Sequence, residues 1–364
     1  MQETRTLSQR LHLDLPLLIG LMTLSGIGLM VLYSAGGEST GIVIRQTVRL
    51  IVAFAVMLAV AQINPRHLFH WSPWLYMAGL CLLVAVLYVG DIAQGAQRWL
   101  RLGPFNFQPS ELAKLTVPMM VAYFFAERTL PPRTLQVVAA ALIAIVPTAL
   151  IVRQPDLGTA LLIACSGGFV LFLAGMRWRL ILGLLLVMAA SAPAMWQVMH
   201  DYQRRRVLTF FDPEQDPLGS GYHIIQSKIA IGSGGVYGKG WLNGTQSQLD
   251  FLPERSTDFV FAVLSEEFGM LGVALLLAVY LFVVFRGLYI ATQAQDSFGR
   301  LLAGSLILTF FIYVFVNLGM VSGLLPVVGL PLPLISYGGT SLVTVMAAFG
   351  VLMSIHTHRR LLSN

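Results

Sequence analysis

Long apolar runs are the feature that most constrains what this chain can fold into. Segments of about 20 hydrophobic residues recur along the sequence, and each is long enough to cross the roughly 30 Å hydrocarbon core of a bilayer. We expect these segments to be helical, because an open sheet edge cannot survive in lipid. With 56% hydrophobic and 11% charged residues, a soluble fold would lack the polar surface it needs. The sequence therefore predicts an all-α polytopic membrane protein.

We expect about ten transmembrane helices within a single integral membrane domain, residues 1–364. No small-residue cleavage site follows the first apolar run, so that run is predicted to be a retained span rather than a signal peptide. One large loop, residues 199–257, separates the seventh span from the eighth. The predicted spans cover residues 14–34, 46–63, 72–90, 110–126, 134–152, 157–175, 179–198, 258–285, 301–325 and 337–355.

The distribution of arginines predicts the orientation in the membrane. An even number of spans places both termini on one side, and the positive-inside rule selects the cytoplasm as that side. The internal segments then hold Arg5, Arg10, Arg66, Arg128, Arg133, Arg177, Arg179, Arg286, Arg300, Arg359 and Arg360. The short external segments hold Arg45, Arg49, Arg98, Arg101 and Arg153. Both termini are therefore predicted to be cytoplasmic, with loop 199–257 outside.

Several ionisable residues lie at the outer ends of the predicted spans. Glu111 and Lys114 are spaced i, i+3, which puts them on one helix face about 5–6 Å apart. Asp156 opens the sixth span in "RQPDLGTA", and Asp258 opens the eighth. Ionisable groups at that depth usually face a cavity and mark a substrate path. We therefore predict a polar site at the outer membrane surface.

Each of these residues also has a purely structural interpretation. In "RSTD", Ser256 or Thr257 is suited to cap a helix, with Asp258 at the positive end of its dipole. Glu111 and Lys114 are equally suited to a structural ion pair. What favours function is that segments far apart in the sequence deliver polar groups to one membrane level.

The remaining polar residues near the membrane also have both a functional and a structural interpretation. Arg98 and Arg101 are suited to anchor on anionic headgroups, and Trp99 is typical of an interfacial aromatic residue. Glu266 and Glu267, deep in the eighth span, are suited to bond neighbouring helices, and no role at the site is predicted for them.

Other patterns carry less information. The run "GSGGVYGKG" (232–240) lacks the glycine and the hydroxyl residue that a phosphate loop requires, and it predicts a mobile glycine-rich loop. His67 and His70 have helical spacing but no third ligand nearby, so no zinc site is predicted. Cys81 and Cys165 lie inside apolar runs and form no disulfide framework. We find no internal repeat that supports an inverted-repeat transporter.

Four motifs resemble those of a known family. They are "GAQRWLRLGPFNFQPSELAK" (95–114), "RQPDLGTA" (153–160), "GKGWLNGTQSQLDFLPERSTDFVFAVLSEEFG" (238–269) and "GLPLPLISYGGTS" (329–341). They are similar in content and order to the SEDS proteins, the family of shape, elongation, division and sporulation, and the matching hydrophobic frame covers nearly the whole chain. Within the family they look more like the elongation member than the division member.

The resemblance implies a peptidoglycan glycosyltransferase of the bacterial cytoplasmic (inner) membrane. It would polymerise lipid II into glycan strands at the outer, periplasmic face, for cell-wall elongation and rod shape. The implied partners are a class B penicillin-binding protein, which is a transpeptidase, and other membrane proteins of the elongation complex; no nucleic-acid partner is predicted. Two alternatives stay open on the residues alone: a lipid II flippase, and a non-enzymatic scaffold for wall synthesis.

The resemblance also implies roles for single residues. By motif match, Asp258 falls on the family's catalytic aspartate, and Trp99, Glu111, Lys114 and Asp156 fall on functionally important positions. The reaction needs a base for the attacking sugar hydroxyl and cations for the departing pyrophosphate. The cations that suit the pyrophosphate are Arg98, Arg101 and Lys114, with Arg45, Arg49, Lys239 and Arg255 as further candidates. In-line attack would invert the anomeric centre.

The expected roles of the remaining acids follow from this chemistry. Glu111 would orient Lys114, and Asp156 would fix an arginine or help to bind a divalent ion. No cofactor motif is evident in the sequence, and the metal requirement is left open, with Mg²⁺ or Mn²⁺ at the pyrophosphate as one arrangement.

Overall fold

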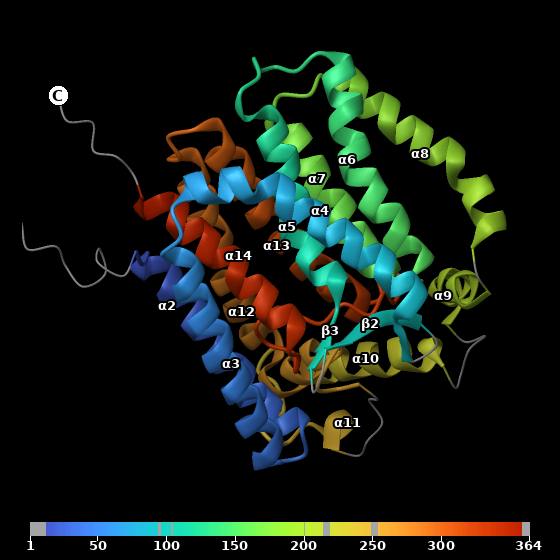
Figure 1. The fold of residues 1–364 in the computed structure, drawn as a ribbon. Helices are drawn as coiled ribbons and strands as arrows, with labels where there is room; N and C mark the ends of the chain where they lie inside the picture. Colours follow the sequence, from blue (N-terminus) through green and yellow to red (C-terminus); the bar gives the residue numbers. More distant parts are fainter. Residues whose placement is uncertain are drawn as a thin grey trace, which may run out of the picture.

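The computed structural model describes residues 12–93, 96–102, 105–199, 201–213, 219–248 and 254–358. Its helices form one bundle (Figure 1). They are α2 (Leu15–Ala35), α3 (Thr40–Ala61), α4 (Pro65–Val89), α5 (Pro109–Ala126), α6 (Thr134–Arg153), α7 (Leu157–Leu173), α8 (Trp178–Val198), α9 (Asp201–Phe211), α10 (Ser220–Gly234), α11 (Thr245–Gln248), α12 (Val260–Thr292), α13 (Ser297–Val321) and α14 (Thr340–Thr357).

Every predicted span coincides with a helix, and the bounds differ by up to seven residues. Within the described ranges, seven helices are long and apolar enough to cross a membrane: α2, α3, α4, α6, α12, α13 and α14. Helix α7, at 17 residues, is shorter, and α5 carries Glu111 and Lys114 in its first turns. The chain is therefore an integral membrane protein, and the count of ten crossings stays a prediction.

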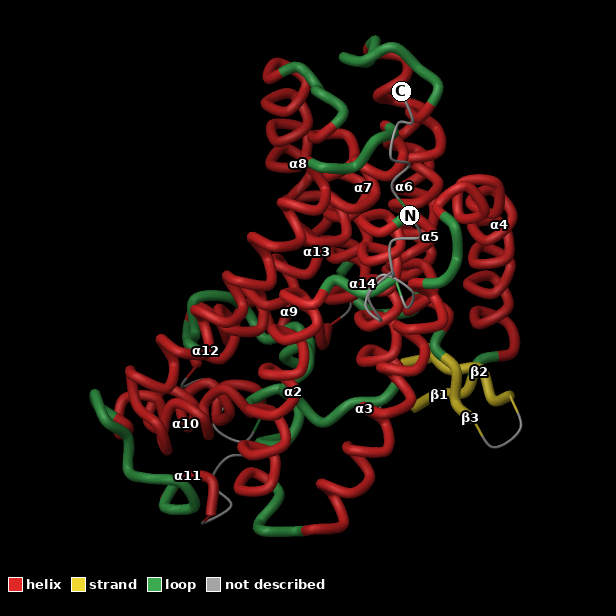
Figure 2. Tube along the Cα trace, turned by 90° about the vertical axis from the view of Figure 1, so that its left-hand side faces the viewer, coloured by secondary structure: helices red, strands yellow, loops and turns green. Residues whose placement is uncertain are grey.

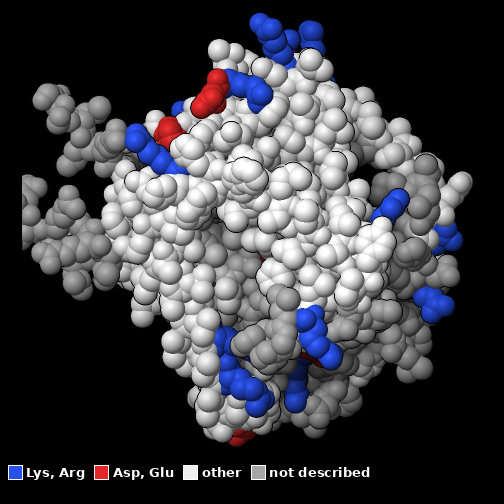
Figure 3. All heavy atoms as spheres, viewed as in Figure 1, with Lys and Arg blue, Asp and Glu red and all other residues white. Residues whose placement is uncertain are grey.

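The surface charge agrees with a membrane-embedded bundle. Figure 3 shows charged side chains toward the upper left edge and toward the lower and right-hand edges, with a broad uncharged surface between them. Large apolar side chains on the outer helices face outward, among them Ile19, Ile51, Leu135 and Leu186. Exposed apolar side chains on this scale are stable only against lipid.

The prediction of an all-α chain was wrong in one place. Between α4 and α5 the chain forms a small antiparallel sheet of β1 (Asp91–Ala93), β2 (Ala96–Leu102) and β3 (Phe105–Phe107), in the order β1-β2-β3. Trp99 pairs with Asp91, and Leu100 pairs with Phe107. Long apolar runs indicate membrane-spanning helices, and this sheet lies between two such runs. Its short strands alternate polar and apolar residues, so the apolar runs carry no information about it.

Helix α13 lies at the centre of the bundle and packs against α5, α7 and α12. Its residues are mostly buried, and Ser305 Oγ donates to the carbonyl of Ser166 on α7 at 2.7 Å. Helix α14 packs along α3, and α4 packs along α5. Lipid tails offer no hydrogen-bond acceptor, so this hydrogen bond between two helices satisfies the buried hydroxyl of Ser305.

The described chain begins and ends at the same end of the bundle. The rings of His12 and His358 stack with their centroids 4.0 Å apart. Arg286 on α12 donates to Asp14 at 2.6 Å, and His356 on α14 lies 3.3 Å from the same carboxylate. The sheet and α10 lie at the other end (Figure 2). We call these the termini end and the sheet end.

Loop 199–257 contains structure of its own. Helix α9 follows α8, and helix α10 packs against α12. Ser227 Oγ on α10 donates to the carbonyl of Val321 at the end of α13, at 2.8 Å. These contacts fix the loop on the sheet end of the bundle.

The glycine-rich segment after α10 is pinned rather than mobile, which corrects the prediction. Helix α12 is interrupted at Gly269, where φ is +62° and ψ is −161°. The interruption frees backbone groups that pair with this segment: Met270 N donates to Gly235 O at 2.9 Å, and Gly240 N donates to Glu267 O at 2.9 Å. A Cβ at Gly238 would lie 2.1 Å from Glu267 O, so only glycine allows this approach.

Candidate active site

Two adjoining cavities open at the sheet end of the bundle. The larger, about 740 Å³, is lined by residues of β2, α5, α7, α13 and the segment before α14. The second, about 590 Å³, holds Asp258. The residues that line both cavities are Arg98, Arg206, Gly329 and Pro331. The predicted polar site therefore exists as two compartments that meet at two arginines.

The larger cavity holds the pair on α5. Lys114 Nζ donates to Glu111 Oε1 at 2.7 Å, and both side chains are more than 90% buried. The ammonium also lies 5.1 Å from the ring centroid of Tyr313 on α13. The second oxygen of Glu111 is buried and accepts no hydrogen bond. Glu111 thus fixes Lys114 at the cavity wall as expected, and a buried pair of this kind is retained only where its contacts offset desolvation.

Asp156 organises the opposite wall. It caps α7 by accepting from Thr159 N at 3.1 Å, and its other oxygen accepts from Gln108 Nε2 at 3.1 Å. Arg98 Nη1 lies 3.9 Å from the same oxygen, and the Arg98 guanidinium also donates to the carbonyls of Gln154 and Pro155. The expectation that Asp156 fixes an arginine is thus met by Arg98, which is held over the cavity while it stays partly exposed.

Asp258 lies in the turn before α12. The N-cap of that helix is Phe259, and no side chain caps it. The prediction that Ser256 or Thr257 caps was wrong: Thr257 Oγ1 instead donates to Glu254, and the Ser256 carbonyl accepts from Tyr337 N at 2.8 Å. These bonds divert the cap residues into the turn and leave Asp258 facing the cavity.

The backbone around Asp258 is held by the segment before α14. Asn317 Nδ2, fully buried on α13, donates to the carbonyl of Asp258 at 3.0 Å and to that of Leu330 at 2.6 Å. Ser336 Oγ donates to the carbonyl of Thr257 at 2.5 Å. Among the described residues, no group donates to the Asp258 carboxylate itself. The backbone is fixed and the carboxylate is left for a ligand, which is how a base must be presented.

The ionisation of Asp258 is perturbed toward neutral pH. The pKa of its carboxyl is raised to about 6, first by burial and second by the nearby charge of Glu254, while the charge of Arg206 lowers it. A carboxyl in this range is mostly ionised at neutral pH and a stronger base than an exposed aspartate. General bases work best with a pKa near the operating pH.

Gly329 keeps the junction of the two cavities open. Its φ of +74° lies in the left-handed region, and a Cβ there would sit 3.5 Å from Asp258 Oδ2. A side chain at this position would therefore occupy the space beside the carboxylate where the compartments meet.

The structure brings together most of the predicted site residues. Trp99, Glu111, Lys114 and Asp156 line the larger cavity, Asp258 lines the second, and Arg98 lines both. Arg101, Lys239 and Arg255 line neither cavity. Arg49 lies just outside, with its guanidinium 4.3 Å from the ring centroid of Tyr337, which lines the second cavity.

Lys239 belongs to a separate cluster. Its ammonium donates to Glu266 Oε1 at 2.7 Å and to Thr245 Oγ1 at 2.7 Å. Glu266 is fully buried and also accepts from Gln246 N at 3.0 Å. Glu267 accepts from Ser34 on α2. The two glutamates that the sequence left unassigned thus tie the segment after α10, and helix α2, to α12.

Arg206 is the main site residue that the sequence analysis missed. It lies on α9, lines both cavities and acts electrostatically on Asp258. The sequence shows it only as one of three consecutive arginines, "RRR" at 204–206. If residues 201–211 are taken as a helix, Arg204, Arg205 and Arg206 lie on different faces of it. This is the one feature of the sequence that distinguishes Arg206 from its two neighbours.

The cavity does not present a ligand cage for a divalent cation. Lys114 occupies one oxygen of Glu111, and the two oxygens of Asp156 accept from Thr159 and Gln108. In the described part of the chain, no group of three His, Cys, Asp or Glu side chains could hold a metal ion. The residues present therefore do not fit an ion held by the protein alone.

A family model supplies the decisive comparison. The model of the FtsW, RodA and SpoVE proteins, described as cell cycle proteins, matches residues 9–361. The chain belongs to the SEDS family. Three of the four motifs quoted from the sequence of this SEDS protein contribute Trp99, Lys114, Asp156 and Asp258 to the two cavities, and the fourth contributes Gly329 and Pro331.

Individual relatives agree with the family. This SEDS chain is similar to the peptidoglycan glycosyltransferase MrdB of Escherichia coli K12, with 54% identity over 99% of this chain and 97% of that one. It is similar to the solved rod-shape-determining protein RodA of Thermus thermophilus, with 31% identity, 94% and 96% coverage and a TM-score of 0.72. A structure from a peptidoglycan synthase complex that coordinates polymerisation and crosslinking matches with 36% identity, 94% and 97% coverage and a TM-score of 0.82.

Proposed function

We propose that this SEDS protein is a peptidoglycan glycosyltransferase that polymerises lipid II into glycan strands for cell-wall elongation and rod shape. Asp258 is the general base, transfer inverts the anomeric centre, and the site faces the outer side of the bacterial cytoplasmic membrane. The observation that carries the proposal is one half-buried carboxylate that accepts no hydrogen bond from the described residues and lies at the edge of a cavity walled by Arg98, Arg206 and Lys114.

The arrangement suits transfer from a diphosphate donor. Pyrophosphate leaves as an anion and needs cations rather than a strong acid, so a single carboxylate is sufficient, unlike the carboxylate pair of a glycosidase. In the proposed complex the diphosphate lies in the larger cavity against Lys114, Arg98 and Arg206. The acceptor hydroxyl lies in the second cavity, beside Asp258. The reacting carbon then lies at the junction that Gly329 keeps open.

Asp258 takes the hydroxyl proton as the oxygen attacks. The C–O bond to the diphosphate breaks on the opposite side, and the negative charge that develops there meets preorganised cations. The bonds of Asn317 and Ser336 to the backbone around Asp258 hold the base in place during transfer. An Mg²⁺ or Mn²⁺ at the pyrophosphate stays an open prediction from the chemistry of the reaction, and no step above depends on it.

The relatives support the assignment to wall synthesis. MrdB is named a peptidoglycan glycosyltransferase, and the matching complex is described as coordinating polymerisation with crosslinking. By extension, we propose that a class B penicillin-binding protein supplies crosslinking beside this chain. Both termini are proposed to be cytoplasmic, which is supported by the meeting of the two described chain ends at the end of the bundle opposite the site.

The depth of the polar site favours a polymerase over a flippase. Below Lys114, the space between α5, α13 and α14 shrinks to about 40 Å³ and is lined by Leu306, Phe310 and Phe349 among other apolar residues. A flippase needs polar groups along the whole path of a charged headgroup. Between the site and the termini end, the described residues that line this space are mostly apolar.

One assay separates the candidate functions. The purified protein, its penicillin-binding partner and lipid II are mixed in detergent, and glycan length is measured on a gel. We expect a ladder of long strands. Detergent has no two sides, so neither a flippase nor a scaffold produces a ladder there, and an unchanged lipid II band would reject the proposal.

A further inference from the structure

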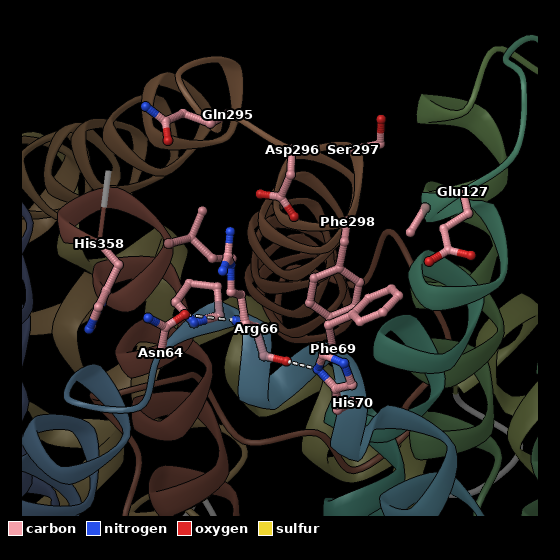
Figure 4. Close-up of a pocket in the computed structure, with 13 residues that line it drawn as sticks. Asn64, Arg66, Phe69, His70, Glu127, Gln295, Asp296, Ser297, Phe298 and His358 are labelled. Carbon is pink, nitrogen blue, oxygen red and sulfur yellow. Dashed lines mark hydrogen bonds between the residues drawn. The ribbon is translucent and has the colours of Figure 1, made fainter. Parts of the chain in front are cut away.

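A third cavity, of about 530 Å³, opens at the termini end of the bundle (Figure 4). It lies among the start of α4, the end of α5, the turn between α12 and α13, and the end of α14. Helices α5, α13 and α14 each reach from the site to this cavity, and 18 residues of α5 alone rise about 27 Å. That length is close to the hydrocarbon thickness, so the cavity lies at the opposite membrane surface from the site.

The charges in this cavity are placed against the helix dipoles. Arg66 lies in the first turn of α4, at the positive end of that helix. Glu127 is the C-cap of α5, at the negative end of that helix. Each charge adds to a dipole end of the same sign instead of offsetting it. The cavity therefore has a cation at the start of one helix and an anion at the end of another.

The side chains of Arg66 and Glu127 are both exposed. Among the described residues, no ion pair forms with Arg66 or Glu127. Arg128, next to Glu127, turns its guanidinium to the carbonyl and ring of Phe124. Asp296 caps α13 by accepting from Gly299 N at 3.3 Å, and its carboxylate adds a second negative charge to the lining of the cavity. Figure 4 shows Arg66 and Asp296 projecting into the cavity, with Glu127 on another wall.

The floor and the flank of the cavity are apolar and interfacial. Phe69 and Phe298 pack edge to face, with their centroids 5.4 Å apart, and form the floor. One and two turns further along α4, Trp71 and Trp74 are 47% and 77% exposed. Of the two, Trp71 is nearer to the start of α4, where an interfacial tryptophan is typical of the level of lipid headgroups.

We propose that this cavity binds the headgroup of a zwitterionic aminophospholipid such as phosphatidylethanolamine. The phosphate lies against Arg66 and the start of α4, and the ammonium lies against Glu127 and the end of α5. The acyl chains pass out along the exposed face of α4. A ligand that carries both charges neutralises both walls at once, whereas a purely anionic lipid neutralises only one.

The test uses the full-length protein in detergent and measures bound lipid by native mass spectrometry. Dioleoyl phosphatidylethanolamine is compared with dioleoyl phosphatidylglycerol, which has the same chains and no amine. We expect the ethanolamine lipid to bind about fivefold more tightly, the scale of one partly screened ion pair. Equal affinities would overturn the proposal.

Matched variants locate the site. Arg66→Gln should weaken both lipids, Glu127→Gln should weaken only the ethanolamine lipid, and Glu127→Lys should reverse the preference. Arg300→Gln, an exposed cation on α13 that does not line the cavity, should change neither affinity. Variants at positions 66 and 127 that behave like Arg300→Gln would exclude this cavity. Phosphoethanolamine that binds as tightly as the lipid would exclude a lipid as the occupant.

Discussion

Asp258 shows how one residue acquires its chemistry from three neighbours. Burial and Glu254 raise the pKa of its carboxyl, Arg206 lowers it, and Asn317 fixes the backbone that carries it. Glu254 and Arg206 come from different segments, the turn before α12 and helix α9. The proton affinity of this carboxylate is therefore set by tertiary structure, and the residue type alone does not determine it.

The pH profile follows from the direction of this shift. An aspartate accepts a proton only when ionised, so kcat/KM for polymerisation should rise with pH through about 6 and level off above it. Glu254→Gln removes a negative charge and should move the rising limb to lower pH. Arg206→Gln removes a positive charge and should move it to higher pH. Arg205→Gln, an exposed neighbour that lines neither cavity, should leave the limb in place. A limb that Glu254→Gln does not move would refute this electrostatic account.

The buried pair on α5 should behave as a unit. Glu111→Gln leaves a buried ammonium without its counter-ion, and Lys114→Met leaves a buried carboxylate in the same state, each at a cost of about 3–5 kcal/mol. The double variant leaves no unpaired charge. In a polymerisation assay with a parallel melting curve, it should be no worse than the worse single variant. Fully additive losses would mean that the two residues act separately.

At the scale of elements, the interruption of α12 at Gly269 is what allows the segment after α10 to dock. Gly269→Ala would place a Cβ 2.3 Å from Gly238 N at a φ of +62°, and strain of this kind costs roughly 1–3 kcal/mol. We expect a lower melting temperature and faster proteolysis at residues 235–246, detected by mass spectrometry. Gly168→Ala on α7, where nothing lies within 4 Å of the added Cβ, is the control and should melt like the parent. An intact segment in Gly269→Ala would show that the interruption is not required.

The helices were predictable because the length of an apolar run is a local property of the sequence. The sheet before α5 was not, since its strands are short and its pairing is non-local. For the same reason, Lys239 was assigned to the diphosphate although it pairs with Glu266, 27 positions away in the sequence. Asp156 and Lys114 were found because each lies at a helix end with a recognisable motif, whereas Arg206 depends on how α9 folds back over the cavity.

At the scale of the whole molecule, the two ends of the bundle have different tasks. The sheet end holds the two site cavities, and the termini end holds the third cavity and both described chain ends. Helices α5, α13 and α14 connect them through a mostly apolar interior. This difference between the two ends is expected of a membrane enzyme whose active site lies at one membrane surface and whose chain ends lie at the other.

The orientation can be measured by cysteine labelling in intact cells. In a background that lacks Cys81 and Cys165, Tyr237→Cys on the sheet end should react with an impermeant maleimide from outside. Gln295→Cys on the termini end should react only after permeabilisation. Both positions are exposed, so accessibility depends on the membrane alone. Labelling with the opposite pattern would place the site in the cytoplasm.

The substitution Asp258→Asn tests the central claim most directly. Asparagine keeps the shape of the side chain and cannot take a proton, and general-base catalysis is typically worth about 10²–10⁴-fold in rate. With lipid II in detergent, we expect the variant to express normally, to melt within a few degrees of the parent, to co-purify with its penicillin-binding partner, and to make no detectable glycan. A well-folded variant that keeps more than about a tenth of the parent rate would contradict the assignment of Asp258 as the base.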